Sequence, residues 1–122
     1  MNLSLNRIIL FVNDVQQLKL FYQQNFQFQL SEEIANEWVV LATGSCELAL
    51  HKAGPHSPSV APENNNAKLV FQTTASLRQL REQLVRNNVE MKEVRSFGNS
   101  PYLFCDGKDI EGNIFQIMQR VN

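Results

Sequence analysis

The chain has 122 residues, of which 43% are hydrophobic and 19% charged, a balance that suits one soluble globular domain with a single core. Eleven basic and twelve acidic side chains give a net charge of −1, and no basic cluster stands out. Nucleic acid and membrane surfaces are therefore not expected partners. The apolar run at residues 8–12 is too short for a signal core or a membrane span, so a cytoplasmic location is expected.

The first half of the sequence predicts a strand, a helix and three further strands. The β-branched and aromatic run Arg7 to Val12 is typical of a strand. A helix follows, with Asn13 or Asp14 as its cap. Its apolar residues at helical spacing are Val15, Leu18, Phe21 and Tyr22. "FQFQL" (residues 26–30) alternates strictly, and "EWVVLATG" and "SCELALHKAG" predict two more strands with Gly44 in the turn between them.

The second half repeats this order after a break. Residues 54–66 hold three of the four prolines and a triple asparagine, which predicts an exposed loop or linker. "AKLVFQT" then predicts a strand, and "SLRQLREQLVRNN" a helix with a Ser76-x-x-Gln79 capping box and a stripe of leucines at 77, 80 and 84. Three strands follow, in "VEMKEV", "PYLFCD" and "NIFQIMQR".

Two halves of the same order indicate an internal repeat of about sixty residues. Arg7 then stands at the same phase of its half as Lys68, and Glu47 in "CELAL" corresponds to Gln116 in "FQIMQ". Each half is too small to bury its apolar face alone, so the two halves are expected to pack together.

Alternation along the strands divides the side chains between two faces. The apolar set that the helices should cover comprises Ile8, Leu10, Val12, Leu48, Leu50, Leu69, Phe71, Phe115 and Ile117. Arg7, Glu47, Lys68 and Gln116 fall on the other face, among apolar neighbours. Polar groups that converge in an apolar concavity are typical of a small-molecule site, but the same residues could be solvated at the strand rims. Both interpretations stay open at this stage.

The cysteines and histidines offer little chemistry. Cys46 and Cys105 fit no metal or CxxC spacing and are expected to be reduced, mostly buried thiols. His56 lies in the predicted loop. His51 is the first candidate for a general base, because its ordinary pKa suits proton transfer. It shares a face with Glu47 but lies roughly 13 Å away along the strand, too far for one metal ion.

Two stretches resemble a known superfamily. "RIILFVNDVQQLKLFYQQNFQFQL" is similar to the opening of the glyoxalase/bleomycin-resistance/extradiol-dioxygenase group, the vicinal oxygen chelate superfamily, and "FCDGKDIEGNIFQI" to its terminal F-x-D-P-D/E-G-N-hydrophobic-E-hydrophobic signature. The resemblance implies an α+β fold in which two paired βαβββ modules form a curled mixed sheet around a cleft. It implies a single domain over residues 1–122, with module 1 at 1–54, a linker loop at 55–66, module 2 at 67–122, and a homodimer.

The resemblance also implies where a metal would bind. The four ligand positions of metal-using members fall on Arg7, Glu47 (or, with a slip of one residue, Leu48), Lys68 and Gln116. Arginine cannot lose its proton to bind a metal, and lysine resists doing so. No cofactor is therefore expected. A divalent metal, held by Glu47 and Gln116, is the alternative.

Three functions follow from these residues. The preferred one is a pocket that binds a small anionic or oxygen-rich ligand without a metal, using Arg7, Glu47, Lys68 and Gln116. Its apolar walls would be Phe11, Trp38, Tyr102 and Met118. The alternative, implied by the family, is a metal-dependent lyase (lactoylglutathione lyase-like), isomerase or dioxygenase. A third interpretation is structural, with Arg7, Glu47 and Lys68 in a closed ion-pair network.

Overall fold

The computed structural model of the protein describes residues 2–55 and 67–121. Its contacts divide the chain into two compact units, Met1–Ser59 and Val60–Asn122. We refer to them as the first and the second module. Beyond Pro55, the loop predicted at residues 54–66 lies outside the described residues, and so does His56 within it.

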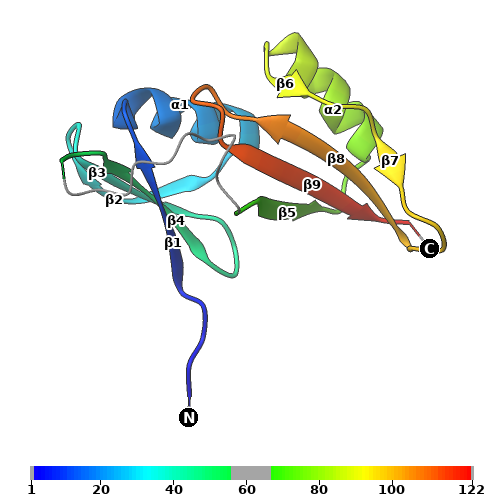
Figure 1. Cartoon of the computed structure of the whole chain (residues 1–122), viewed down its shortest axis with the longest axis horizontal. Helices are drawn as coiled ribbons and strands as arrows, with labels where there is room; N and C mark the ends of the chain where they lie inside the picture. Colours follow the sequence, from blue (N-terminus) through cyan, green and yellow to red (C-terminus); the bar gives the residue numbers. More distant parts are fainter. Residues whose placement is uncertain (1, 56–66, 122) are drawn as a thin grey trace. The chain divides into compact units, whose positions relative to one another are not determined.

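The first module has the predicted order of one strand, one helix and three strands. Its elements are β1 (Arg7–Val12), α1 (Val15–Phe26), β2 (Gln29–Ile34), β3 (Trp38–Ala42) and β4 (Glu47–Lys52). The strands form one sheet in the order β1-β4-β3-β2 (Figure 1). Strand β1 runs parallel to β4, and the other pairs are antiparallel, so the sheet is mixed. Gly44 lies in the turn between β3 and β4 with a φ of 111°, which glycine adopts without strain.

Helix α1 begins at the predicted cap and ends later than predicted. The Asp14 carboxylate accepts a hydrogen bond from the backbone N–H of Gln17 at 3.0 Å. The helix continues to Phe26, and Gln27 ends it in the left-handed conformation, with a φ of 59°. The strand predicted from residue 26 is therefore wrong at its start, because β2 begins only at Gln29.

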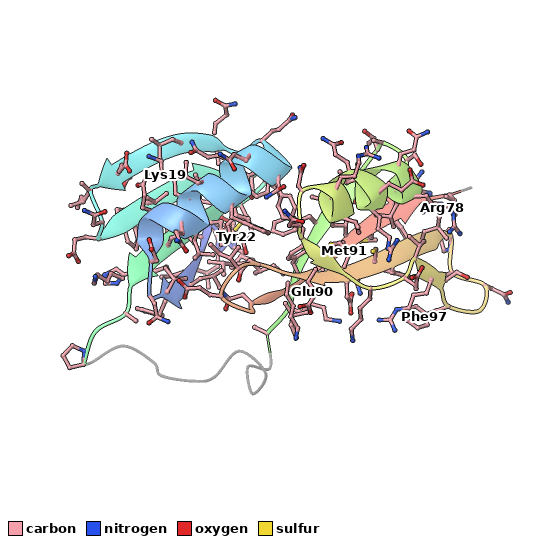
Figure 2. All side chains as sticks on the ribbon, turned by 90° about the horizontal axis from the view of Figure 1, so that it is seen from above. Lys19, Tyr22, Arg78, Glu90, Met91 and Phe97 are labelled. Carbon is pink, nitrogen blue, oxygen red and sulfur yellow. The ribbon has the colours of Figure 1, made fainter. Side chains whose placement is uncertain are left out.

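Aromatic packing explains this difference. The Phe26 ring lies against the rings of Phe21 and Tyr22 in the same helix, with centroids 6.0 and 5.6 Å apart. Phe28, just beyond the helix, contacts both Tyr22 and Phe26. Figure 2 labels Tyr22, which α1 directs toward the sheet, and its side chain is fully buried. The alternation of Phe26 and Phe28 thus reflects a ring cluster at the end of a helix, not a strand.

The second module repeats the topology with one interruption. Its elements are β5 (Leu69–Thr73), α2 (Leu77–Arg86), β6 (Glu90–Met91), β7 (Arg95–Ser96), β8 (Tyr102–Lys108) and β9 (Ile114–Arg120). The sheet order is β5-β9-β8-β6, with β7 also paired to β8. Strand β5 runs parallel to β9. The Ser76 hydroxyl caps α2 by accepting the backbone N–H of Gln79 at 3.3 Å, as the capping box predicted.

The strand predicted over "VEMKEV" (89–94) is confirmed only at β6, and a second short strand, β7, follows beyond it. Both β6 and β7 pair antiparallel with β8, and residues 92–94 separate them. The carbonyl of Lys92 accepts hydrogen bonds from the Arg81 Nε–H at 2.7 Å and from the Cys105 thiol at 3.1 Å. Two side-chain donors therefore hold this backbone carbonyl, and the edge strand is interrupted at that point.

The predicted division of side chains between the two sheet faces is confirmed for five of the nine helix-facing residues, and the other four, Ile8, Leu10, Leu69 and Phe71, are half-buried. Val12, Leu48, Leu50, Phe115 and Ile117, predicted to lie under the helices, are at most 3% exposed. On the opposite face, three large apolar residues are exposed, Ile9 by 42%, Phe11 by 39% and Val70 by 51%. That face is where the polar candidates lie.

The two modules differ in register. Arg7 pairs directly with Glu47 across β1 and β4. Gln116 pairs with Val70 of β5, not with Lys68, which precedes that strand by one residue. Both modules therefore carry these polar residues on the same face of the sheet. In the second module, however, Lys68 lies two residues before Val70, the residue opposite Gln116.

Gly107 is needed for close packing between the strands of the second module. A Cβ at this position would lie 2.5 Å from Sδ of Met91, 2.7 Å from Cζ of the buried Phe115 and 3.0 Å from the carbonyl oxygen of Glu90. Gly107→Ala is therefore expected to lower the free energy of unfolding by about 1–3 kcal/mol, measured by urea denaturation. Gly54→Ala is the control, because nothing lies within 4 Å of its added Cβ. Equal stability of the two variants would contradict this packing.

Two negative findings concern the described residues. Within 2–55 and 67–121, neither helix is long and apolar enough to cross a membrane. Both cysteines are free thiols, Cys46 half-buried and Cys105 fully buried. Burial raises the pKa of the Cys105 thiol, which disfavours the reactive thiolate.

Candidate ligand-binding site

The first module brings Arg7 and Glu47 together. Nε and Nη2 of Arg7 both donate to Oε1 of Glu47, at 3.1 and 2.9 Å. Nη2 also lies 3.8 Å from Oε1 of Glu32, in β2, the strand at the other edge of the sheet. The Arg7 and Glu47 side chains are 30% and 28% exposed, so solvent weakens this ion pair. One cation is thus shared between two carboxylates.

Aromatic rings surround this ion pair on the same face. The Arg7 guanidinium lies 5.4 Å from the centroid of the Trp38 ring, and the indole N–H of Trp38 donates to Oε2 of Glu32 at 3.2 Å. The Trp38 ring contacts His51 at 5.6 Å, and His51 contacts Phe11 at 5.5 Å. Phe11, His51 and Trp38 therefore contact one another in that order, and Arg7 lies against Trp38. The candidate residue Phe11 is at the end of this group farther from Arg7.

The surroundings of His51 favour a role in ring packing over a role as a general base. Its Nδ1 lies 2.9 Å from the carbonyl oxygen of Lys52, an arrangement that fixes the ring when Nδ1 carries the proton. Among the described residues, no carboxylate forms a hydrogen bond with His51, so the orienting acid of a catalytic dyad is missing.

The second module gathers its polar side chains around Asp106. Oδ2 accepts the Lys68 ammonium at 3.0 Å and lies 3.3 Å from Nη2 of Arg95. Oδ1 accepts the Gln116 amide N–H at 2.9 Å. The antiparallel register places Asp106 directly opposite Gln116. Lys68 and Gln116 are therefore brought together through a carboxylate that the sequence did not single out.

The environment keeps Asp106 ionised. Burial by itself would raise the pKa of its carboxyl, since the residue is only 8% exposed. The hydrogen bonds from Gln116 and Lys68 and the charges of Lys68 and Arg95 outweigh that effect, so the net result is a pKa below the usual value. The carboxylate is thus a fixed negative charge that orders the cations around it.

A small hollow lies beside this cluster. It has a volume of about 210 Å³. Its lining consists of Lys68, Glu90, Lys92, Asp106, Gly107, Lys108 and Ile114. Lys108 lies 3.7 Å from Glu90, so this hollow mixes three lysines with two carboxylates. Its size suits a few non-hydrogen atoms, such as an acid group with a short substituent.

Tyr102 stands apart from the Asp106 cluster. It begins β8, four residues before Asp106, and pairs with Arg120 of β9. Its ring contacts Phe104 at a centroid distance of 6.2 Å, and the Arg120 guanidinium lies 5.5 Å from its centroid. Tyr102 is therefore part of an aromatic surface on β8.

Asp106, Glu32 and Arg95 were missed because their roles depend on strand register. Asp106 was visible only as the last letter of "PYLFCD", and alternation places it on the correct face without naming its partner. Glu32 lies in a strand that was predicted three residues too early. Arg95 lies in β7, beyond the predicted "VEMKEV" strand.

The sequence matches the model of a known protein family. The model described as "Glyoxalase/Bleomycin resistance protein/Dioxygenase superfamily" matches residues 4–117. The chain belongs to this superfamily. A match over nearly the whole chain accords with the two βαβββ modules and their α+β class. No curated protein sequence gives a significant match.

Solved structures share the superfamily fold. Lactoylglutathione lyase from Agrobacterium tumefaciens matches with a TM-score of 0.76 and 13% identity, over 95% of this chain and 92% of that one. The fosfomycin resistance protein FosX from Listeria monocytogenes matches with a TM-score of 0.72 and 15% identity, over 98% and 93%. An integron cassette protein from the V. cholerae mobile metagenome matches with a TM-score of 0.74 and 21% identity, over 98% and 97%. At such identities the likeness shows the fold alone.

The metal that many superfamily members use does not fit the residues of this chain. In the described part of the sequence, no three His, Cys, Asp or Glu side chains are grouped to hold an ion. At the positions that the resemblance assigns to ligands, Arg7 and Lys68 are cations. The Gln116 amide nitrogen donates to Asp106, and Oε1 of Glu47 already accepts two N–H groups. One oxygen of Glu47 is therefore already held by Arg7, and the neighbouring cations repel a divalent ion.

Proposed function

We propose that the protein binds a small anionic or oxygen-rich organic ligand without a metal ion. The observation that carries the proposal is the replacement of metal ligands by Arg7 and Lys68, each hydrogen-bonded to a carboxylate on the face opposite the helices. A cation held in place by a neighbour is ready to receive a ligand oxygen, and such charge-assisted bonds are the strong ones.

The polar clusters of the two modules differ in their balance of charge. In the first, Glu47 and Glu32 together outnumber Arg7, so that side suits hydroxyl or carbonyl oxygens better than a full negative charge. In the second, Lys68 and Arg95 outnumber Asp106, and their side chains are 40% and 49% exposed. The anionic ligand would therefore bind to the second module, at the 210 Å³ hollow.

A panel of small acids tests the proposal. Acetate, phosphate, methylphosphonate and benzoate would be titrated by calorimetry into protein kept in a chelator. At least one is expected to bind, and Lys68→Gln is expected to weaken it roughly tenfold, the loss of one charge-assisted hydrogen bond. Arg78→Gln, on α2, is the control of equal charge change. If no acid binds, or if both variants behave as wild type, the ion pairs serve structure alone and the proposal fails.

The enzymatic alternative depends on a metal. A mutant of FosX has been solved with Mn(II) and 1S,2S-dihydroxypropylphosphonic acid, so a member of this fold can hold an ion and an oxygen-rich anion together. Turnover by a metal-dependent lyase, isomerase or dioxygenase would require the same of this chain, against the repulsion of a divalent ion by Arg7 and Lys68. The proposal also includes a cytoplasmic homodimer, as the sequence and the resemblance led us to expect.

A further inference from the structure

A row of three aromatic rings runs along β8 and the turn before it. Phe97 contacts Phe104 with a centroid distance of 5.3 Å, and Phe104 contacts Tyr102 at 6.2 Å. Figure 2 shows Phe97 beside β7, on the side of β8 away from α2. Tyr102 and Phe104 alternate with buried Cys105 and share the face of Asp106. The row therefore continues the face that holds the polar cluster.

An arginine stands at each end of this row. The Arg95 guanidinium lies 4.9 Å from the Phe97 centroid, and the Arg120 guanidinium 5.5 Å from the Tyr102 centroid. Both distances are within the range of cation–π attraction. Arg95 also reaches Asp106 at 3.3 Å, so it joins the aromatic row to the polar cluster.

The row is not ordinary core. Phe97 is 52% exposed and the Arg95 side chain 49%, whereas Cys105 and Phe115 on the covered face are fully buried. Tyr102 and Phe104 are half-buried, so Phe97, with Arg95 beside it, is the ring of this row on which another ring can stack. Lys68, Arg95 and Arg120, together with Lys92 and Lys108 of the hollow, outnumber the carboxylates of Asp106 and Glu90 on this side, which favours an anionic occupant.

The first module carries a matching row with the opposite balance of charge. Phe11, His51 and Trp38 form its three rings, and Arg7 stands at the Trp38 end. There, however, two carboxylates neutralise the single arginine. The repeat thus extends to the aromatic rows, and only the second module combines its row with an excess of positive charge.

We infer that the ligand is a planar aromatic acid. This deepens the proposed function and rests on it. The ligand ring stacks on the exposed ring of Phe97, and the acid group lies at the Arg95 and Lys68 end of the row, beside the hollow. Phe97 is then a determinant of specificity for flat ligands, and Arg95 orients the acid group.

Three matched probes test this inference by calorimetry. 2-Naphthoate supplies both features, decahydro-2-naphthoate keeps the carbon skeleton and charge but is saturated, and 2-naphthalenemethanol keeps the flat ring without charge. 2-Naphthoate is expected to bind roughly tenfold more tightly than either of the others. Phe97→Leu should abolish the advantage over the saturated acid, and Phe97→Trp should retain it. Arg95→Gln should abolish the advantage over the alcohol, while Arg78→Gln leaves it unchanged.

The possible results distinguish the binding of a planar aromatic acid from the binding of small anions in general. If both acids bind equally well and depend on Lys68, anion binding stands and the aromatic inference is overturned. If neither acid binds, the proposed function fails as well. If Phe97→Leu leaves affinity unchanged but alters the oligomeric state in sedimentation, the row is an interface between copies of the chain, and the inference is wrong.

Discussion

Asp106→Asn is expected to lower the free energy of unfolding at neutral pH by about 1–3 kcal/mol. The carboxylate is 8% exposed and accepts hydrogen bonds from Lys68, Arg95 and Gln116. An amide carries no charge for the two cations, and its NH₂ group would face other donors. Urea denaturation measures the loss, and Glu93→Gln is the control, because its side chain is 90% exposed and also pairs with an arginine.

The pH dependence of this difference has a defined sign. The folded-state pKa of Asp106 is lowered, so its contribution to stability is fully present above the unfolded-state value of about 3.9. It is lost as the pH falls through the folded-state pKa. The stability curves of the wild type and Asp106→Asn should therefore converge in acid. A gap that stays constant down to pH 2, or that widens in acid, would contradict the assigned ionisation.

Gln116→Glu should destabilise the fold at neutral pH by roughly 2 kcal/mol, although it restores the residue that the family signature has there. The Gln116 amide nitrogen lies 2.9 Å from Oδ1 of Asp106, so a carboxylate at this position would meet another carboxylate. One of the two would have to take up a proton or move away. The amide at this position is thus explained by the aspartate across the strand.

A double variant tests whether the loss in Gln116→Glu comes from repulsion between two carboxylates. Asp106→Asn combined with Gln116→Glu exchanges donor and acceptor across the same strand pair, and should be more stable than Gln116→Glu alone. The loss in Gln116→Glu should also fade below about pH 4, where the introduced carboxyl is protonated. If Gln116→Glu is as stable as wild type at pH 7, the hydrogen bond to Asp106 does not determine the residue at this position.

The sequence predicted which face of a sheet each side chain lies on better than it predicted which residues that side chain contacts. Period-two alternation was sufficient to place Leu48, Phe115 and their neighbours in the core and Arg7 and Gln116 on the opposite face, because that pattern depends only on local chain geometry. Capping chemistry located the start of both helices for the same reason.

Contacts between strands could not be predicted in this way. The pairing of Asp106 with Gln116 depends on the register of β8 against β9, and the offset of Lys68 from Gln116 on the register of β5. The end of α1 was misplaced because "FQFQL" alternates like a strand while its rings pack around a helix terminus. Alternation therefore placed Arg7, Glu47 and Gln116 on the face opposite the helices, but it did not reveal that Asp106 joins Lys68 to Gln116.

The most direct test of the central claim is one acid titrated into the protein with and without divalent metal. 2-Naphthoate would be titrated into protein stripped by chelator and then dialysed, and into the same protein with Mn²⁺, Ni²⁺ or Zn²⁺ at equal molarity. The account predicts the same dissociation constant in every case, sensitive to Lys68→Gln, and no stoichiometric metal in the purified protein by elemental analysis. A tightly held ion at one equivalent, with binding lost on its removal, would contradict it.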